Sequence, residues 1–186
     1  TSSRDRAVIS QLRSDIINHK KLTGWPMPKY DFFVLEISMH GERKSTITKI
    51  QIASNNLCYG PYPEPEDEVE QVLVIERNGR IEISRFAYGF GDTKLIERDR
   101  FLIDQGKAEA IFDAIRRCFY EDYEGYMVTD VGRWDMTVFD DDGHRDKFSG
   151  PLGEWSHNEV DGESVSDIIR TKLGRKNLFV FDGNRT

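Results

Sequence analysis

The chain has 186 residues, of which 38% are hydrophobic and 32% are charged, and its formal net charge is −7. These proportions are typical of a globular protein in water, and the length suits a single domain, residues 1–186, that buries a core without disulfides or metals. No apolar run reaches the roughly 20 residues that a membrane-spanning helix requires, so we expect a cytoplasmic protein.

The charge is distributed unevenly along the chain. Both ends are basic, whereas residues 60–82 and residues 135–163 are acidic. Separated charge of this kind can steer a partner protein, or it can serve solubility alone. If the acidic stretches converge in space, their carboxylates could imitate phosphates, and the partner would be a basic nucleic-acid-handling protein. The low isoelectric point of about 5.2 argues against direct nucleic-acid binding.

The first part of the chain is predicted to contain one helix and one hairpin. Apolar residues recur at three- and four-residue intervals between residues 5 and 20, which is the spacing of one helical face. Residues 31–39 and 45–53 are predicted to pair as two strands, because β-branched residues are frequent in the second and a Gly-containing loop joins them.

A proline-rich stretch, residues 58–70, follows this hairpin. Three prolines alternate with one aromatic and two acidic residues, in the order Pro61, Tyr62, Pro63, Glu64, Pro65 and Glu66. Prolines hold φ near the polyproline value and remove backbone donors, so we predict an extended, exposed arm. The arm is also a weak sub-boundary within the predicted single domain.

Two dipeptides, Asn78-Gly79 and Asp142-Gly143, each separate two runs of strand-forming residues. Such dipeptides supply the positive φ angles that a two-residue hairpin turn requires. We therefore predict one hairpin over residues 72–86 and a second around Asp142-Gly143, which is preceded by a strand at residues 126–131 or 134–139. A further strand is predicted over residues 93–102.

Two helices are predicted in the second half of the chain. The first, residues 105–121, begins after Asp104 as an N-cap and carries one apolar stripe. The stripe consists of Ala108, Ile111, Phe112, Ile115 and Phe119. The second begins near Ser164 and ends at Gly174. The four consecutive apolar residues 178–181 are predicted to form a short central strand.

These elements predict an α+β fold, in which β-hairpins form antiparallel sheets and about three amphipathic helices pack on one side. The last third of the chain also carries an ordered set of short motifs: Trp134-Asp135-Met136-Thr137-Val138, Asp142-Gly143, Phe148-Ser149-Gly150, Ser166-Asp167-Ile168-Ile169-Arg170 and Leu178-Phe179-Val180-Phe181-Asp182-Gly183. This order resembles an α+β domain found in uncharacterised bacterial proteins. The resemblance implies a bacterial cytosolic domain, and because that family has no known activity it implies no functional residues.

Asp140, Asp142 and His144 are the densest set of candidate metal ligands. Hard divalent cations bind several carboxylate oxygens on a short loop, so these side chains could hold Ca²⁺ or Mg²⁺. The spacing differs from that of a calcium loop, and the same residues also suit a hairpin turn with acidic residues for solubility. With Asp130 and Asp135 added, the cluster defines an alternative function, a small divalent-metal-dependent hydrolase or phosphoryl-handling enzyme.

The sequence contains no motif of a nucleophile elbow, a zinc protease or a thiol–disulfide oxidoreductase. We therefore expect no cofactor, and we expect Cys58 and Cys118 to be reduced thiols. The favoured hypothesis is a non-catalytic protein–protein interaction module of regulatory, inhibitory or immunity type. Its partner-binding surface is predicted to combine exposed aromatic and acidic side chains. The predicted residues are Tyr62, Glu64, Glu66, Tyr88, Phe90 and Trp155.

Overall fold

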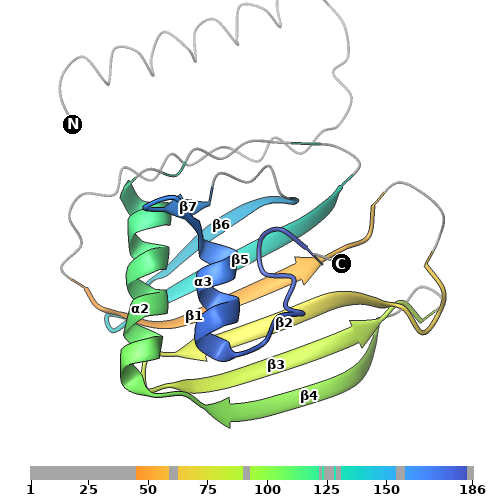
Figure 1. Ribbon diagram of the computed structural model, residues 1–186, viewed down its shortest axis with the longest axis horizontal. Coiled ribbons are helices and arrows are strands. Elements are labelled where there is room, and N and C mark those ends of the chain that lie inside the picture. The colour runs from red at the N-terminus through yellow and green to blue at the C-terminus, as the bar shows by residue number, and fades with distance from the viewer. Residues whose placement is uncertain are drawn as a thin grey trace, which may run out of the picture. The chain divides into compact units, whose positions relative to one another are not determined.

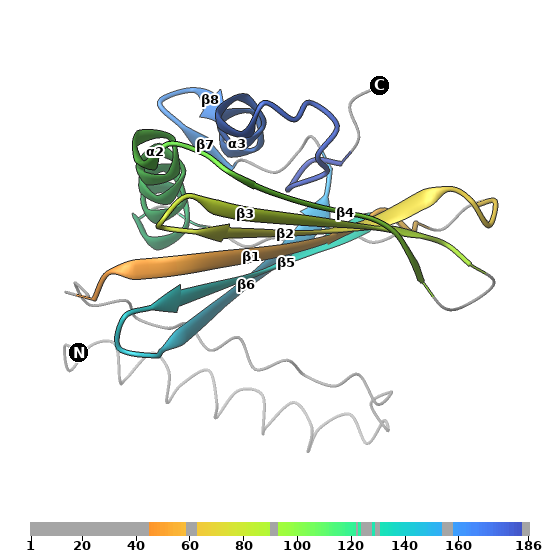
Figure 2. The same ribbon diagram turned by 90° about the horizontal axis from the view of Figure 1, so that it is seen from below.

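The computed structural model describes residues 45–58, 63–89, 93–121, 123, 128, 131–153 and 158–183, and all of them belong to one compact unit. They form a six-stranded antiparallel sheet, a two-stranded ribbon and two α-helices, with both helices on the same face of the larger sheet (Figure 1, Figure 2). This arrangement confirms the predicted α+β fold built from hairpins. The elements predicted over residues 5–20 and 31–39 lie outside the described residues, and the single domain stays a prediction.

The strands are β1 (Ile47–Asn55), β2 (Glu68–Glu76), β3 (Arg80–Ala87), β4 (Lys94–Leu102), β5 (Gly132–Asp140), β6 (Arg145–Leu152), β7 (Glu159–Val160) and β8 (Glu163–Ser164). The helices are α2 (Gln105–Arg116) and α3 (Val165–Leu173), and the π-helical turn η1 (Arg117–Glu121) continues α2. No helix in the described ranges is long and apolar enough to cross a membrane. Cys58 is exposed and Cys118 is buried in η1, and no disulfide joins these two thiols.

β1 is one of the two middle strands of the six-stranded sheet, whose order is β4-β3-β2-β1-β5-β6. It pairs with β2 on one side and with β5 on the other, and both pairings are antiparallel. β2 and β5 therefore run in the same direction, which places the β2–β3 turn and the β5–β6 turn at the same end of the sheet. Both sides of β1 are occupied, so the predicted pairing of residues 45–53 with residues 31–39 is wrong. Ile50 and Ile52 of β1 are at most 1% exposed, so β1 also lies at the centre of the hydrophobic core.

Both predicted hairpins form, but each turn is one residue longer than predicted. Positive φ angles occur at Gly79 (86°) and Gly143 (84°), and not at Asn78 or Asp142. The Gly79 N–H donates to the Glu76 carbonyl at 2.9 Å, which makes the glycine the third residue of the loop. A three-residue hairpin loop needs a left-handed conformation at its last residue alone, so the residue before the glycine keeps an ordinary conformation.

The apolar stripe predicted over residues 105–121 is buried against the sheet, which confirms that prediction. Asp104 caps α2 as predicted, because its side chain accepts a hydrogen bond from the Lys107 N–H at 2.9 Å. The stripe continues into η1, where Phe119 packs edge-to-face against Trp134 of β5 with ring centroids 5.7 Å apart. Aromatic packing of this geometry joins the α2–η1 segment to β5.

The prediction of a central strand at residues 178–181 is wrong. All four residues are at most 3% exposed, as residues of a central strand would be. They nevertheless form a turn after α3, and Val180 has a φ of 45°, which a strand residue does not adopt. We call residues 177–183 the C-terminal turn.

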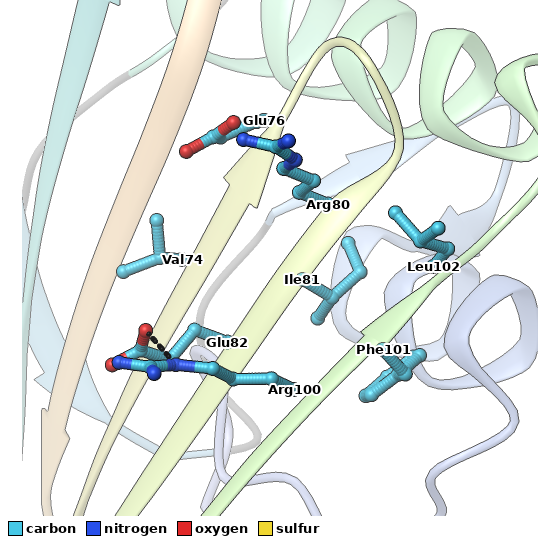
Figure 3. A pocket seen from close by; sticks show the side chains of 8 residues that line it. All are labelled: Val74, Glu76, Arg80, Ile81, Glu82, Arg100, Phe101 and Leu102. Carbon is cyan, nitrogen blue, oxygen red and sulfur yellow. Dashed lines mark hydrogen bonds and ion pairs between the residues drawn. The ribbon is translucent and has the colours of Figure 1, made fainter.

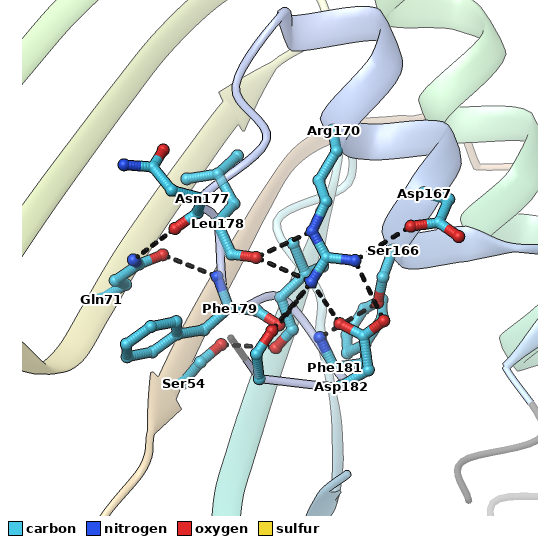
Figure 4. Close-up of polar contacts among 12 residues, drawn as sticks. Ser54, Gln71, Ser166, Asp167, Arg170, Asn177, Leu178, Phe179, Phe181 and Asp182 are labelled. Atoms are coloured by element: carbon cyan, nitrogen blue, oxygen red, sulfur yellow. Dashed lines mark hydrogen bonds and ion pairs between the residues drawn. The ribbon is translucent and has the colours of Figure 1, made fainter. Parts of the chain in front are cut away.

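Polar side chains from the sheet satisfy the buried backbone of the C-terminal turn (Figure 4). The side-chain carbonyl of Gln71, on β2, accepts a hydrogen bond from the Phe179 N–H at 2.8 Å. The Ser54 hydroxyl, on β1, donates to the backbone carbonyl of Val180. Buried backbone groups must find a partner, but that partner need not be another strand. The apolar pattern therefore predicted the burial of this segment correctly and its conformation incorrectly.

Arg170 of α3 makes the largest set of contacts to the C-terminal turn. Its guanidinium donates to the Leu178 carbonyl at 2.9 and 2.7 Å and to the Gly183 carbonyl at 3.0 Å, and it forms an ion pair with Asp182. The Arg170 and Asp182 side chains are 8% and 3% exposed. Burial opposes the charged form, but the hydrogen bond and charge of Asp182 outweigh it and raise the pKa of Arg170 above its usual value.

The substitution Arg170→Met is expected to lower the free energy of unfolding by about 3–5 kcal/mol, because it removes a buried charge from its ion pair and from two carbonyl groups. Arg175→Met is the control, since Arg175 pairs with Asp99 at 2.8 Å but is 41% exposed. That change should cost about 1 kcal/mol or less. Urea unfolding followed by tryptophan fluorescence measures both losses, and equal losses would contradict the central role of Arg170.

Candidate interaction surface

Three of the predicted partner-binding residues, Glu64, Glu66 and Tyr88, lie in the described part of the chain, and the structure brings them to one end of the sheet. The N–H groups of Tyr88 and Gly89 donate to the carbonyls of residues 67 and 65 at 3.0 and 3.3 Å. These bonds hold the segment before β2 beside the end of β3, with Glu64 and Glu66 exposed. Tyr62, Phe90 and Trp155 lie outside the described residues.

Residues 64–67 form a tight turn, so the prediction of an extended proline arm is wrong for these residues. The Asp67 N–H donates to the Glu64 carbonyl at 3.0 Å, and the Asp67 carboxylate accepts from the Glu64 N–H at 2.8 Å. Pro65 occupies the second position of the turn, where its fixed φ is favourable. The alternation of prolines therefore ends in a turn that directs the chain into β2.

The most acidic parts of the two acidic stretches do not lie together on the surface. Glu64 and Glu66 precede the start of β2, whereas Asp140 ends β5 and residues 141–142 follow it. Because β2 and β5 run in the same direction, these two groups of carboxylates lie at opposite ends of the sheet. The structure therefore does not bring together the carboxylates that were expected to imitate nucleic-acid phosphates.

The ligand atoms of Asp140, Asp142 and His144 lie within 4.8 Å of one another in the β5–β6 turn. The turn uses the same carboxylate for its own structure, because Asp140 accepts a hydrogen bond from the His144 N–H at 2.8 Å. Partial burial would raise the pKa of Asp140, but hydrogen bonds from Ser45 and from the His144 N–H hold it below its usual value. The hairpin turn thus brings the three side chains together and also uses the Asp140 carboxylate for its own hydrogen bonds.

The larger acidic cluster that the alternative enzyme hypothesis requires does not form. Asp135 pairs with Arg133 at 2.6 Å within β5, and Asp130 lies outside the described residues. Five residues of extended strand separate Asp135 from Asp140, a distance of roughly 17 Å along β5. A metal held by the turn residues would therefore not be reached by Asp135.

The most exposed apolar side chains of the described residues lie on β4, an edge strand that was not part of the predicted surface. Leu102 is 72% exposed, Ile96 49% and Leu95 43%, whereas Leu57 and Val128, the other two large exposed apolar residues described, are 38% exposed. Three such side chains on one edge strand are more than the scattered apolar exposure of an ordinary surface.

Register places the side chains of this edge on the face of the sheet opposite α2 and α3, which we call the far face. Ile81 and Ile83 of β3 point into the core, so Glu82 between them points to the far face, together with Arg100 opposite it on β4. A bulge at Ile96 shifts the alternation by one residue, so Leu95, which lies opposite Phe86, also points to the far face. We call the resulting set of side chains the β4 surface: Arg80, Glu82, Leu95, Arg98, Arg100 and Leu102.

The β4 surface adjoins a shallow groove of about 460 Å³ (Figure 3). The lining residues come from β2, β3 and β4: Val74, Glu76, Arg80, Ile81, Glu82, Arg100, Phe101 and Leu102. The groove combines exposed apolar surface with charged groups that hold each other at fixed positions, as in the Glu82–Arg100 pair drawn in Figure 3. A surface of this composition suits a polypeptide better than a small apolar ligand.

Arginines outnumber carboxylates on the β4 surface. Glu82 accepts from Arg100 at 2.7 Å and also pairs with Arg98 at 3.4 Å. The hydrogen bond from Arg100 is the main cause that holds the pKa of Glu82 below its usual value, and the charge of Arg98 adds to it against the opposing effect of burial. Arg80 is exposed, and no carboxylate of the described residues forms an ion pair with it.

The other edge of the sheet, β6, offers fewer backbone groups than β4. Pro151 has no N–H to donate, and the Ser149 carbonyl already accepts a hydrogen bond from the Tyr123 hydroxyl at 2.8 Å. β4 carries no proline, so each of its residues has an N–H to donate. Within the described ranges, β4 is therefore the edge that remains open to another chain.

Sequence reasoning missed the β4 surface for a definable reason. The arginines of residues 77–100 stand beside acidic residues in the sequence, and the structure pairs Arg100 with Glu82. The sequence of residues 93–102 does not say which neighbour its strand has, so it does not say whether Leu95 or Leu102 is covered. The available signal was the charged run Glu97-Arg98-Asp99-Arg100, which lies between apolar residues and leaves this strand without a continuous apolar face.

Replacing Glu82 with Gln is expected to lower the melting temperature at neutral pH and to have no effect in acid. A carboxylate whose pKa is depressed in the folded state stabilises the fold above its unfolded pKa, and this stabilisation is lost as the pH falls through the folded value. The difference between the wild type and Glu82→Gln should therefore close in acid. Glu66→Gln, at an exposed turn, should change little at either pH; calorimetry measures all three, and a difference that persists in acid contradicts the assignment.

No protein-family model matches the chain, and no curated protein matches it. The resemblance of the last third to an uncharacterised bacterial domain therefore stays a prediction, and the function has to be argued from the surface itself.

Proposed function

We propose that this chain is a non-catalytic protein–protein interaction module, a cytoplasmic protein of regulatory, inhibitory or immunity type. The single observation that carries the proposal is the accumulation of exposed apolar side chains on β4, an open edge strand. Edge strands offer unpaired backbone donors and acceptors, and soluble proteins normally protect them. β4 carries a bulge and charged side chains, which limit unspecific pairing, but it also exposes Leu95, Ile96 and Leu102, which suit association with a specific chain.

The energetic argument rests on the apolar side chains. Leu102 is 72% exposed and Leu95 is 43% exposed, so both lose apolar contact with water when a partner covers them. Full burial of one leucine side chain is worth about 1.5–3 kcal/mol. Two such anchors beside charged groups with fixed positions form the usual centre and rim of a protein interface.

The β4 surface is continuous with the described part of the predicted partner-binding surface. Leu95 lies opposite Phe86 of β3, and Tyr88 follows two residues later, directly after the end of that strand. The turn that carries Glu64 and Glu66 is hydrogen-bonded beside this position. A partner on the β4 surface would therefore reach these three predicted residues without crossing the sheet.

Affinity capture from a nuclease-treated extract of the source organism tests the proposal. The bait Leu95→Glu/Leu102→Glu is expected to lose the dominant protein that the wild-type bait retains. The control bait Leu57→Glu changes an exposed leucine in the loop after β1, and it should retain that protein. Circular dichroism must show the same fold for all baits. A wild-type bait that captures no protein contradicts the proposed function, and a partner retained by every bait removes the β4 surface from it.

A second function, a small divalent-metal-dependent hydrolase or phosphoryl-handling enzyme, is favoured by one observation, the convergence of Asp140, Asp142 and His144. It predicts that Mg²⁺, Mn²⁺ or Ca²⁺ raises the melting temperature of the wild type, because a ligand that binds only the folded state stabilises it. Asp142→Asn/His144→Gln should abolish the rise. A wild-type melting temperature that no ion changes contradicts the metal-dependent function.

A further inference from the structure

We propose that the partner contributes an extended acidic segment, which binds β4 as a seventh strand of the sheet. The inference rests on the proposed function and specifies the chemistry of the partner at the β4 surface. Three features of the described residues carry it: the direction of the backbone groups of β4, the excess of arginines beside them, and the positions of the apolar side chains.

The backbone of β4 has donors and acceptors directed away from β3. The Ile103 N–H donates to the Gly79 carbonyl at 3.0 Å, which fixes the alternation of the β3–β4 ladder. In an antiparallel ladder every second residue directs its N–H and C=O to the other side. For β4 these residues are Arg98, Arg100 and Leu102, so a strand added at this edge would bond to three consecutive outward positions.

The side chains at the same three positions specify the charge of the added strand. Residues directly opposite each other in a ladder lie on the same face, and opposite charges there are favourable. Arg98 and Arg100 share the single carboxylate of Glu82, although each guanidinium has five N–H donors. Acidic residues opposite both arginines would form charge-assisted hydrogen bonds with donors that Glu82 does not use.

The pattern of the added strand follows from the order of these positions. An antiparallel strand that runs from Leu102 towards Arg98 would place an apolar residue first, followed by acidic residues at the second and third alternate positions. Its intervening residues would face the side of β4 where Asp99 pairs with Arg175 and Glu97 pairs with Arg85, so uncharged polar residues suit them. The expected segment is therefore apolar, polar, acidic, polar, acidic.

Charge argues against a second copy of this chain and against a basic partner. In antiparallel pairing of two β4 strands, the registers centred on residues 98 to 100 place one of these arginines opposite an arginine of the other copy. Like charges directly opposite each other destabilise a ladder. A basic segment would meet the same repulsion, whereas an acidic segment compensates the excess charge of the β4 surface.

The test uses the full chain and a labelled peptide, acetyl-Val-Thr-Glu-Thr-Glu-Thr-amide, with binding followed by fluorescence anisotropy. Arg98→Glu/Arg100→Glu is expected to weaken binding by about tenfold or more, because it removes charge-assisted hydrogen bonds. The control Arg133→Glu/Arg145→Glu makes the same change of charge at exposed arginines of β5 and β6, and it should leave the affinity within about twofold.

Three further probes separate strand addition from other binding. A peptide with Lys in place of Glu should bind at least about tenfold more weakly, because it places like charges opposite the arginines. A peptide N-methylated at the amides that face β4 keeps its charge but loses the strand hydrogen bonds, and equal affinity for it overturns the inference. A single-stranded oligonucleotide that binds more tightly than the peptide overturns it in favour of nucleic acid.

Two outcomes distinguish failure of this inference from failure of the proposed function. If the wild-type peptide shows no saturable binding at millimolar concentration, while a captured partner is lost only with Leu95→Glu/Leu102→Glu, the interaction module stands and the acidic strand is wrong. If the wild-type bait captures no partner and the peptide does not bind, both are wrong. If the wild type forms a dimer and Arg98→Glu/Arg100→Glu stabilises it, the result supports repulsion between the arginines of two β4 strands. If this variant disrupts the dimer, the inference is overturned in favour of self-association.

Discussion

The buried guanidinium of Arg170 fixes the C-terminal turn, a part of the core that no strand pairing holds in place. It binds the carbonyls and the carboxylate of the C-terminal turn, and that turn closes the core between α3 and the middle strands. Arg175, between α3 and this turn, reaches the edge of the sheet, where it pairs with Asp99 of β4 and lies 4.7 Å from the ring of Phe101. One face of β4 is therefore fixed by the core, and no strand or helix of the described residues covers its far face or its outer backbone.

The features that the sequence predicted correctly are those that depend on local patterns. The two glycines at positive φ mark their hairpins, and the apolar stripe of α2 follows from spacing within a single helix. The conformation of residues 178–181 depends instead on Ser54 and Gln71, which are more than 100 residues away in the chain. Apolar composition predicts how deeply a segment is buried, but not which polar groups meet its backbone.

The β4 surface likewise depends on a property that the local sequence does not contain. The charge and size of Arg98, Arg100 and Leu102 are visible in the sequence, and so is their place in a strand. Their role depends on β4 having one neighbour rather than two, which is decided by the pairing order of the whole sheet. Edge position is a property of topology, and hairpin signals between adjacent strands do not report it. The partner-binding residues chosen from composition alone therefore included Tyr88 but omitted the strand beside it.

The bulge at Ile96 sets a limit on how a foreign chain could run along this edge. Regular pairing is available only between the bulge and the start of the α2 cap, a length of about six residues. A guest chain that slides by two residues would move a carboxylate against Leu102 or run into the irregular backbone. The bulge thus limits the length of the segment that can pair. It favours a short, exchangeable association in one register over the open-ended stacking of strands that produces fibres.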